Sequence, residues 1–198
     1  MTGAGWYDKY MRKLIMWNVI TLDGYFEGKR AWDLDFHQTV FGEELRTYGI
    51  EQLESADMLV FGRKTYEGMA SYWANAEDDP DEGETAKYMN TLPKIVCTKT
   101  LQAAEWNNTT IVHDAVAELP KLKQRGDGNM FVFGSGKLAA SLMKAGLFDE
   151  YRLCVAPVFL GEGKRLFAEG LPYQKLQLLS ERHLQTGGVI LMYAPLAK

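Results

Sequence analysis

Short apolar runs alternate with amphipathic segments along most of the chain, and each pattern predicts its own kind of element. Runs rich in β-branched or aromatic residues predict strands, which we expect at 12–20, 57–61, 94–98, 110–113, 129–133, 151–158, 174–184 and 189–194. Apolar residues at helical spacing predict helices over 41–53, 63–72 and 115–124. A further helix is expected to start at Ser135, as its cap, and to end at Gly146.

The order of these segments predicts an α/β fold. Parallel strands need helical crossovers that cover both faces of a sheet, whereas the last two runs are joined by a turn containing Gly187-Gly188 and should pair antiparallel. The acidic stretch 75–84 is expected to be a surface loop. We expect a single domain over residues 11–198, preceded by an extension over residues 1–10 that lacks a clear pattern.

Composition and charge narrow the function classes. The 198 residues suffice for one domain with a core, and the net charge of −4 argues against a binder of nucleic-acid backbones. Cys97 and Cys154 lie in apolar runs, so we expect buried thiols rather than a disulfide or metal ligands. No apolar run is long enough to span a membrane, and the start of the chain lacks a secretory signal pattern. We therefore expect a cytoplasmic protein without a membrane, nucleic-acid or metal partner.

The sequence Gly62-Arg63-Lys64-Thr65 ends a buried strand and opens a helix. A glycine at this point lets the backbone approach a ligand closely. The free N–H groups at a helix start, together with the helix dipole, attract anions. The two cations and the hydroxyl strengthen this tendency, and the turn is a candidate phosphate site. Basic residues at a helix start that are merely exposed are the alternative.

The sequence Gly134-Ser135-Gly136-Lys137-Leu138 repeats this arrangement after a second buried strand. Two glycines around a serine leave room for a pyrophosphate over the helix start. Neither the G-x-G-x-x-G fingerprint nor the P-loop spacing is present. A tight strand-to-helix turn without a ligand is the alternative interpretation.

A third polar cluster, Thr98-Lys99-Thr100, ends the strand KIVC. Ligands of open α/β sheets collect at the carboxyl ends of strands, so we expect the three clusters to lie at one edge. A dinucleotide with a pyrophosphate and an added 2′-phosphate needs two such anion sites, which favours NADP.

The order strand, G-R-K-T-Y-E, strand, T-K-T, strand, G-S-G-K resembles the dihydrofolate reductase superfamily. The segments NVITLDG (18–24) and PVFLGEG (157–163) are similar to its riboflavin biosynthesis reductase branch. The resemblance covers nearly the whole chain from Met11. It implies a dihydrofolate reductase-like fold, with a mainly parallel sheet of about eight strands and a C-terminal antiparallel hairpin. It also implies NADPH as the hydride donor.

The resemblance further implies roles for individual residues. The two glycine turns and the loop after KIVC would hold the phosphates, and the end of the first strand would lie beside the nicotinamide. Asn18, Asp23, Leu160 and Gly161 would border the substrate. The implied cofactor-binding residues are Val19, Ile20, Gly62, Arg63, Lys64, Thr65, Thr98, Lys99, Gly134, Ser135, Gly136, Lys137 and Leu138.

The implied activity is the reduction of a small heterocyclic acceptor by NADPH, similar to 5-amino-6-(5-phosphoribosylamino)uracil reductase. Asp23 and Glu44 are the candidates for the catalytic proton donor, and Glu43 or Glu51 could face the pocket instead of Glu44. Asp-Gly is also a common turn pair without any catalytic role. Dihydrofolate reduction and a non-catalytic NADP-binding module are the alternative functions. The resemblance also implies a homodimer that pairs through the sheet edge or the C-terminal strands.

Five aromatic residues are expected near the pocket entrance, where a flat heterocycle would stack, although aromatics beside a sheet are often plain core. They are Trp17, Tyr25, Phe26, Trp32 and Phe36. The loop WDLDFH (32–37) differs from the proline- and tryptophan-containing loop of folate enzymes.

Overall fold

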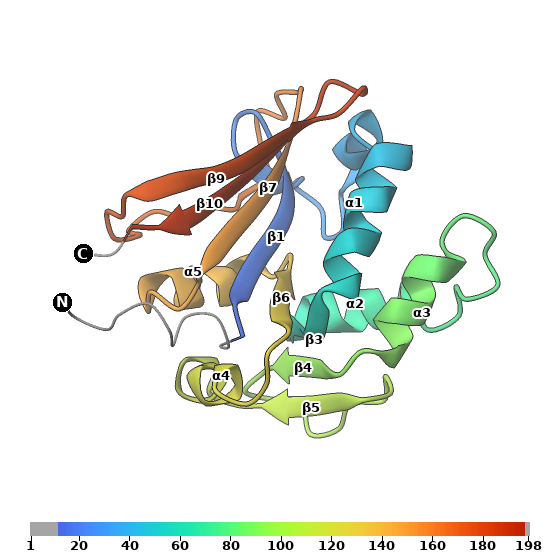
Figure 1. Cartoon of the computed structure of the whole chain (residues 1–198), viewed down its shortest axis with the longest axis vertical. Coiled ribbons are helices and arrows are strands. Elements are labelled where there is room, and N and C mark those ends of the chain that lie inside the picture. The colour runs from blue at the N-terminus through green and yellow to red at the C-terminus, as the bar shows by residue number, and fades with distance from the viewer. Residues whose placement is uncertain (1–11, 197–198) are drawn as a thin grey trace.

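The computed structural model describes residues 12–196, which form one eight-stranded sheet with helices on both faces (Figure 1). The strand order is β5-β4-β3-β6-β1-β7-β10-β9. Neighbours from β5 to β7 run parallel, and β10 pairs antiparallel with both β7 and β9. The strands are β1 (Leu14–Thr21), β3 (Ala56–Gly62), β4 (Lys94–Cys97), β5 (Thr109–Val112), β6 (Asn129–Phe133), β7 (Glu150–Ala156), β9 (Leu176–His183) and β10 (Val189–Pro195). This is the expected dihydrofolate reductase-like fold, with its C-terminal antiparallel hairpin.

The helices divide between the two faces of the sheet (Figure 1). One face packs against α4 (Ala115–Lys123) and α5 (Gly136–Lys144), through a core that includes Leu119 and Leu142. The other face packs against α1 (Glu43–Glu54), α2 (Arg63–Trp73) and α3 (Gly83–Thr91). Alternate residues of the central strands enter the two cores: Leu14 and Met16 on the α5 side, Ile15 and Trp17 on the α2 side.

The parallel register brings the carboxyl ends of the central strands to one edge. Gly62 of β3 is paired with Cys97 of β4, and Trp17 of β1 is paired with Phe133 of β6. The turns that follow β3, β4 and β6 therefore emerge side by side. A small second sheet flanks this edge, formed by β2 (Tyr25–Glu27) and β8 (Lys164–Arg165).

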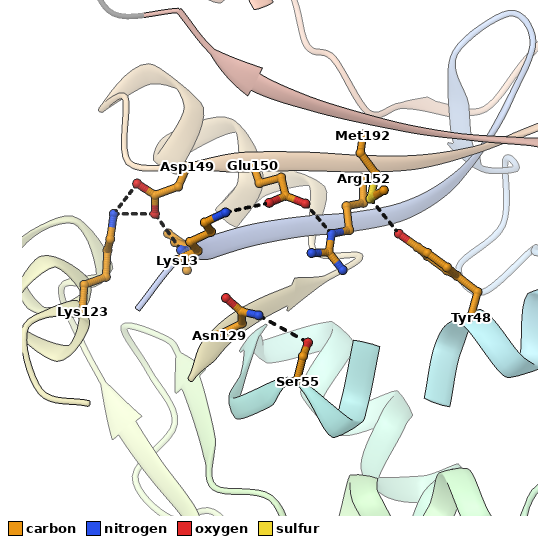
Figure 2. Close-up of polar contacts among 10 residues, drawn as sticks. Lys13, Tyr48, Ser55, Lys123, Asn129, Asp149, Glu150, Arg152 and Met192 are labelled. Atoms are coloured by element: carbon orange, nitrogen blue, oxygen red, sulfur yellow. Dashed lines mark hydrogen bonds and ion pairs between the residues drawn. The ribbon is translucent and has the colours of Figure 1, made fainter. Parts of the chain in front are cut away.

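The opposite edge, at the amino ends of the strands, is held by charged groups that bond to one another (Figure 2). Glu150 is almost fully buried and lies between Arg152, at 2.6 Å from Nε, and Lys13, at 3.5 Å from Nζ. Lys94 is fully buried, and its ammonium group donates to the carbonyl oxygens of three residues around the end of α3. These carbonyls belong to Met89, Asn90 and Leu92, at 2.8, 3.0 and 2.8 Å.

The strands and four of the helices lie within a few residues of the positions predicted from the sequence. Three short elements, β2, β8 and the 3-10 helix η1 (Asp35–Thr39), were not predicted, and neither was α3. The acidic segment 75–84 is mostly exposed, but its last two residues already belong to α3. The expected N-terminal extension, residues 1–10, lies outside the described residues.

Both cysteines are free thiols, and burial raises the pKa of each to about 12. Among residues 12–196, no helix combines the length and the apolar character that a bilayer crossing requires. The same residues contain no group of three or more histidine, cysteine or acidic side chains that could hold a metal ion.

Candidate cofactor and substrate site

The three polar turns predicted from the sequence meet at the carboxyl edge of the sheet. The amide of Gly62 donates to the Ser135 hydroxyl at 2.9 Å, which joins the turn after β3 to the turn after β6. The Arg63 guanidinium donates to the Thr100 hydroxyl at 2.9 Å, which joins the turn after β3 to the loop after β4. These contacts follow from the strand order, because β4, β3 and β6 are consecutive neighbours.

The turn between β6 and α5 has the backbone shape of an anion-binding nest. Gly134 has φ 54° and Ser135 has φ 62°, both left-handed, and the chain then enters the right-handed helix at Gly136. A left-handed residue followed by a right-handed one points successive N–H groups into one concavity. The first N–H groups of α5 also lack partners within the helix. This turn can therefore bind a phosphate through its backbone.

Ser135 occupies the cap position of α5 but does not cap it, which corrects the prediction. Its hydroxyl donates to the carbonyl of Phe133 at 3.1 Å and accepts the amide of Gly62. No bond joins its side chain to the helix N–H groups. The left-handed backbone at Ser135 turns the side chain toward β3, so the hydroxyl fixes one turn to the other and leaves the helix start free for a ligand.

The turn between β3 and α2 offers exposed cations. Arg63 and Lys64 are both exposed at the first turn of α2, where Arg63 also pairs with Glu67 at 2.7 Å. A methyl of Thr65 lies 3.4 Å from the place that a Cβ on Gly134 would take, so the two turns touch. The amide of Gly62 is already bonded to Ser135. The free donors of this turn are therefore those of α2 itself, rather than that of Gly62.

Thr98 and Lys99, both predicted to bind the cofactor, have different places in the loop after β4. Thr98 is buried, and its hydroxyl accepts the amides of Thr100 and Leu101, each at 3.2 Å. It therefore shapes the loop. Lys99 is exposed beside Thr100, whose hydroxyl is bonded to Arg63. The cations available to a ligand here are Arg63, Lys64 and Lys99.

The end of β1 presents a buried polar atom without a partner. Asn18 is 5% exposed, and its Nδ2 makes no hydrogen bond within residues 12–196. Buried amide groups are nearly always bonded, so an orphan of this kind is explained by a missing ligand or water. Trp17 pairs with Phe133, so Asn18 stands beside Gly134 at the start of the nest. Val19 and Ile20 are buried in the same strand end.

Asp23 braces two loops. Its carboxylate accepts the amides of Leu160 and Gly161, at 3.1 and 2.8 Å, and the hydroxyl of Thr21 at 2.5 Å. The Thr21 hydrogen bond, aided by the two amides, lowers the pKa of Asp23 to about 2. A group with this pKa holds no proton near neutral pH. The geometry therefore supports a positioning role for Asp23 at the substrate border and gives no support to its use as proton donor.

None of the candidate acids of α1 points into the sheet. Glu44 accepts the amide of Gln185 at 2.6 Å, in the turn between β9 and β10. Glu43 pairs with Arg46, and Glu51 pairs with Arg182. The α1 residues buried against the sheet are Tyr48, Gln52 and Leu53. The prediction that Glu44 supplies the proton finds no support in this geometry.

Two contacts at the site could not be predicted from patterns in the sequence. Phe26 of β2 lies against Gly136, where a Cβ would come within 2.6 Å of Cζ of the ring. Arg165 of β8 donates to the carbonyl of Asp23 at 2.8 Å and stacks over Tyr25. The aromatic cluster predicted around the pocket entrance contained Phe26 and Tyr25, but Arg165 carried no signal in the sequence.

These residues fit NADPH as a cofactor. The site offers a nest for a pyrophosphate, three cations beside a second helix start, and the amide of Asn18, which has no partner within residues 12–196. The donors are of the kind that bind phosphate oxygens and carboxamides.

Comparison with known proteins identifies the family and the fold. The family of the RibD C-terminal domain matches residues 12–191. The uncharacterized protein YyaP of Bacillus subtilis (strain 168) is 30% identical over 189 residues, which cover 92% of this chain and 94% of YyaP.

Two solved structures share the fold. A putative riboflavin biosynthesis protein from Shewanella sp. PV-4 superposes with a TM-score of 0.77 at 22% identity and covers 93% of this chain and 99% of its own. Dihydrofolate reductase from Enterococcus faecalis, complexed with NADP(H), has a TM-score of 0.62 at 13% identity, over 95% of this chain and 99% of its own.

Proposed function

The chain belongs to the family of the RibD C-terminal domain, and from this premise we propose that it is an NADPH-dependent reductase of a small heterocyclic acceptor. The acceptor class would be a pyrimidine or pteridine, similar to 5-amino-6-(5-phosphoribosylamino)uracil. The observation that carries the proposal is the convergence of two helix starts and three cations at the carboxyl edge, joined by the Gly62–Ser135 and Arg63–Thr100 bonds.

In this proposal each turn has a separate task. The nest at Gly134-Ser135-Gly136 binds the pyrophosphate through its N–H groups, with Lys137 exposed beside it. Arg63, Lys64 and Lys99 bind the 2′-phosphate, which distinguishes NADPH from NADH. When bound, NADPH supplies the hydride.

The remaining residues position the reactants. Val19 and Ile20 line the nicotinamide side. Asn18, which the resemblance placed at the substrate border, is reassigned in this proposal: it stands beside Gly134, and its amide donates to the bound cofactor. Asp23 holds the Leu160–Gly161 corner against the end of β1, where it borders the acceptor. Asp23, with its lowered pKa, is ionised, and Glu44 is turned toward Gln185, so in this proposal the proton that accompanies the hydride comes from solvent. The protein then acts mainly by placing the donor against the acceptor.

Dihydrofolate is a weaker candidate for the acceptor. The folate enzymes hold the pterin with one acid on the first long helix, as the resemblance implies. Here the residues of α1 buried against the sheet include Tyr48 and Gln52 and no acid. This observation favours an acceptor that needs no carboxylate partner. A module that binds NADPH without turnover is the other alternative, and the assay below separates it from a reductase.

The test begins with titrations of NADPH and NADH, followed by the fluorescence of the five tryptophans. We expect NADPH to bind at least about tenfold more tightly than NADH, since a charge-assisted contact contributes about 1.5–3 kcal/mol. The double variant Arg63→Gln/Lys64→Gln should remove most of this preference. Lys121→Gln, which removes an exposed cation of α4, is the matched control. Absence of binding by either nucleotide would overturn the proposal.

Turnover is tested next. Oxidation of NADPH is followed with 5-amino-6-(5-phosphoribosylamino)uracil and, separately, with 7,8-dihydrofolate. Consumption with the first compound alone is the expected result. Consumption with dihydrofolate alone would move the assignment to folate reduction. NADPH binding without consumption of either acceptor would favour the non-catalytic module.

We also propose that the chain forms a homodimer through β9. The apolar run 188–193 is largely β10 and lies inside the sheet between β7 and β9. The edge strand on this side of the sheet is β9, and its residues Leu176, Leu178 and Leu179 are 42–48% exposed. Apolar edge strands are usually paired or covered. Light scattering of the wild type and of Leu178→Lys tests this: a dimer that the substitution dissociates is expected, and a wild-type monomer contradicts it.

A further inference from the structure

The loop between β2 and η1 is built to present one tryptophan. Its ends are joined by a hydrogen bond from the Gly28 amide to the carbonyl of Asp33, at 2.8 Å. The amide of Trp32 donates to the Glu27 carboxylate at 2.6 Å, and Glu27 is paired in turn with Lys164 of β8. Trp32 has φ 63°, a left-handed conformation that is unusual for a bulky residue. Such strain persists where the surroundings enforce it, and it occurs preferentially at functional sites.

The indole of Trp32 packs against Gly68, in the middle of α2; this contact is called the seat of Trp32 below. A Cβ at Gly68 would overlap three atoms of the indole, Cζ2, Cε2 and Cη2. Glycine inside a helix destabilises it relative to alanine, so its presence here has a packing reason. Gly49, inside α1, provides the contrast, because nothing lies within 4 Å of its would-be Cβ. Of these two glycines inside helices, Gly68 is therefore the one whose missing side chain makes room for another residue.

The sheet order shows what this contact spans. Trp32 follows β1 and β2, whereas α2 follows β3, and β6 lies between β3 and β1. A contact from the loop to α2 thus joins elements that lie on the two sides of β6 in the sheet order. Phe133, the last residue of β6, is partly buried on the α2 face of the sheet among the aromatics of the second core. The nest begins at the next residue, Gly134.

We propose that Trp32, seated on Gly68, is the outer wall of the acceptor site and determines which planar acceptors bind. This inference rests on the proposed function. The indole is 45% exposed, so one part contacts Gly68 while the rest is open to a ligand. A flat heterocycle stacks against such a surface. The cofactor side has its own aromatic, Phe26 against Gly136, so the two rings serve different halves of the site.

The seat itself is tested without any ligand. The emission of Trp32 is isolated as the difference between each protein and the same protein carrying Trp32→Phe. Gly68→Ala should expose Trp32 to acrylamide and raise its quenching, while Gly49→Ala, the matched control in a helix of similar length, should leave it unchanged. Circular dichroism checks that both variants fold. Equal acrylamide quenching of Trp32 in Gly68→Ala and Gly49→Ala would contradict the packing of Trp32 on Gly68.

The acceptor role is tested by binding and by kinetics. Equilibrium dialysis of 5-amino-6-(5-phosphoribosylamino)uracil, which needs no turnover, should give a Kd about tenfold weaker for Trp32→Ala and nearly normal for Trp32→Phe, as expected for loss of a stacking surface. In the NADPH oxidation assay, the KM of Trp32→Ala for the pyrimidine should rise with little change in kcat. The affinity of this variant for NADPH should stay the same.

The possible failures are distinct. Loss of NADPH binding affinity in Trp32→Ala would assign Trp32 to the cofactor side and overturn the inference. An unchanged Kd for the pyrimidine in Trp32→Ala would do the same. A third result would separate the two proposals. If Trp32→Ala weakens pyrimidine binding in dialysis but the wild type does not consume NADPH, the reductase proposal is overturned and the role of Trp32 is still supported.

Discussion

Buried charges at the amino edge of the parallel sheet are paired within the chain, whereas donors at the carboxyl edge are left open. The contrast concerns charges and helix-start donors, since the uncharged side chain of Gln52, near the amino edge at the end of α1, is also buried without a partner among residues 12–196. At the amino edge, Glu150 lies between Arg152 and Lys13 (Figure 2). Lys94 donates to three carbonyls, so each of these two buried charges has its partner within the chain. At the carboxyl edge, the starts of α2 and α5 leave N–H groups free, and the buried amide of Asn18 has no partner in the described part of the chain. Closed networks stabilise a fold, whereas open donors are available to a ligand. The difference predicts that substitutions at the two edges affect different measurements.

The largest effect is expected for Lys94→Met. The carbonyls of Met89, Asn90 and Leu92 would lose their donor in the interior, so the free energy of unfolding should fall by about 3–5 kcal/mol. Burial lowers the pKa of Lys94 to about 8, so its charge is retained at neutral pH. Urea unfolding followed by circular dichroism measures the change. Lys87→Met, at an exposed position of α3, is the control. Similar losses in both variants would show that Lys94 contributes no more than a surface cation.

A smaller loss is expected for Glu150→Gln. The substitution leaves Arg152 largely buried without its counter-charge, and it should lower the free energy of unfolding by about 2–4 kcal/mol. The exposed pair Glu118–Lys121 gives the matched control, because Glu118→Gln should cost less than about 1 kcal/mol. NADPH affinity should be unchanged in both variants. A variant that is as stable as the wild type but binds NADPH poorly would contradict the division between the edges.

The carboxyl edge should behave in the reverse way. Asn18→Leu removes an unpaired buried amide, so stability should be unchanged or higher. Loss of one donor to the cofactor should weaken NADPH binding about tenfold, equivalent to about 1.4 kcal/mol. Asn129, at the amino end of the adjacent strand β6, donates to Ser55 at 3.3 Å. Asn129→Leu is therefore the control, with normal NADPH binding expected. Equal NADPH affinities in wild type and Asn18→Leu would mean that water, not cofactor, occupies the position beside Asn18.

The sequence was sufficient to predict the architecture because the elements are local patterns. The run MFVF and the turn G-S-G each constrain the backbone where they stand, and the strand order then brings Gly62 and Ser135 together. The helix α3 was missed because acidic residues before it resemble a loop. Helical spacing likewise does not determine whether Glu44 turns toward the sheet or toward Gln185.

The hydrogen bonds of Asp23 to Leu160 and Gly161 and the packing of Trp32 on Gly68 could not be predicted, because both depend on contacts between distant parts of the chain. Asp-Gly is a local turn pair, and its carboxylate acquires a role only when Leu160 and Gly161 fold against it. Gly68 is a weak helix residue in the sequence, and only the indole of Trp32 explains it. Long-range packing of this kind leaves no periodic signal.

At neutral pH the smallest effect is expected for His37 in η1, beside the carboxyl edge, because its contribution to stability changes only in acid. Burial lowers the pKa of His37 from 6.5 to about 4, and its buried Nε2 makes no hydrogen bond with any residue from 12 to 196. Between these two values the unfolded chain binds a proton that the folded chain does not, so the unfolded state is favoured as the pH falls. The contribution of His37 to stability is complete above pH 6.5 and is lost progressively as the pH falls toward 4.

The free energy of unfolding of wild type and His37→Leu, measured at several pH values in this window, tests this dependence. The variant should be the less sensitive of the two to acid. His183→Gln, at an exposed position of β9, should keep the wild-type slope. Identical slopes for wild type and His37→Leu would mean that His37 is hydrated in solution. The carboxyl edge would then have one unpartnered buried group fewer, and Asn18 would be the stronger indicator of a ligand there.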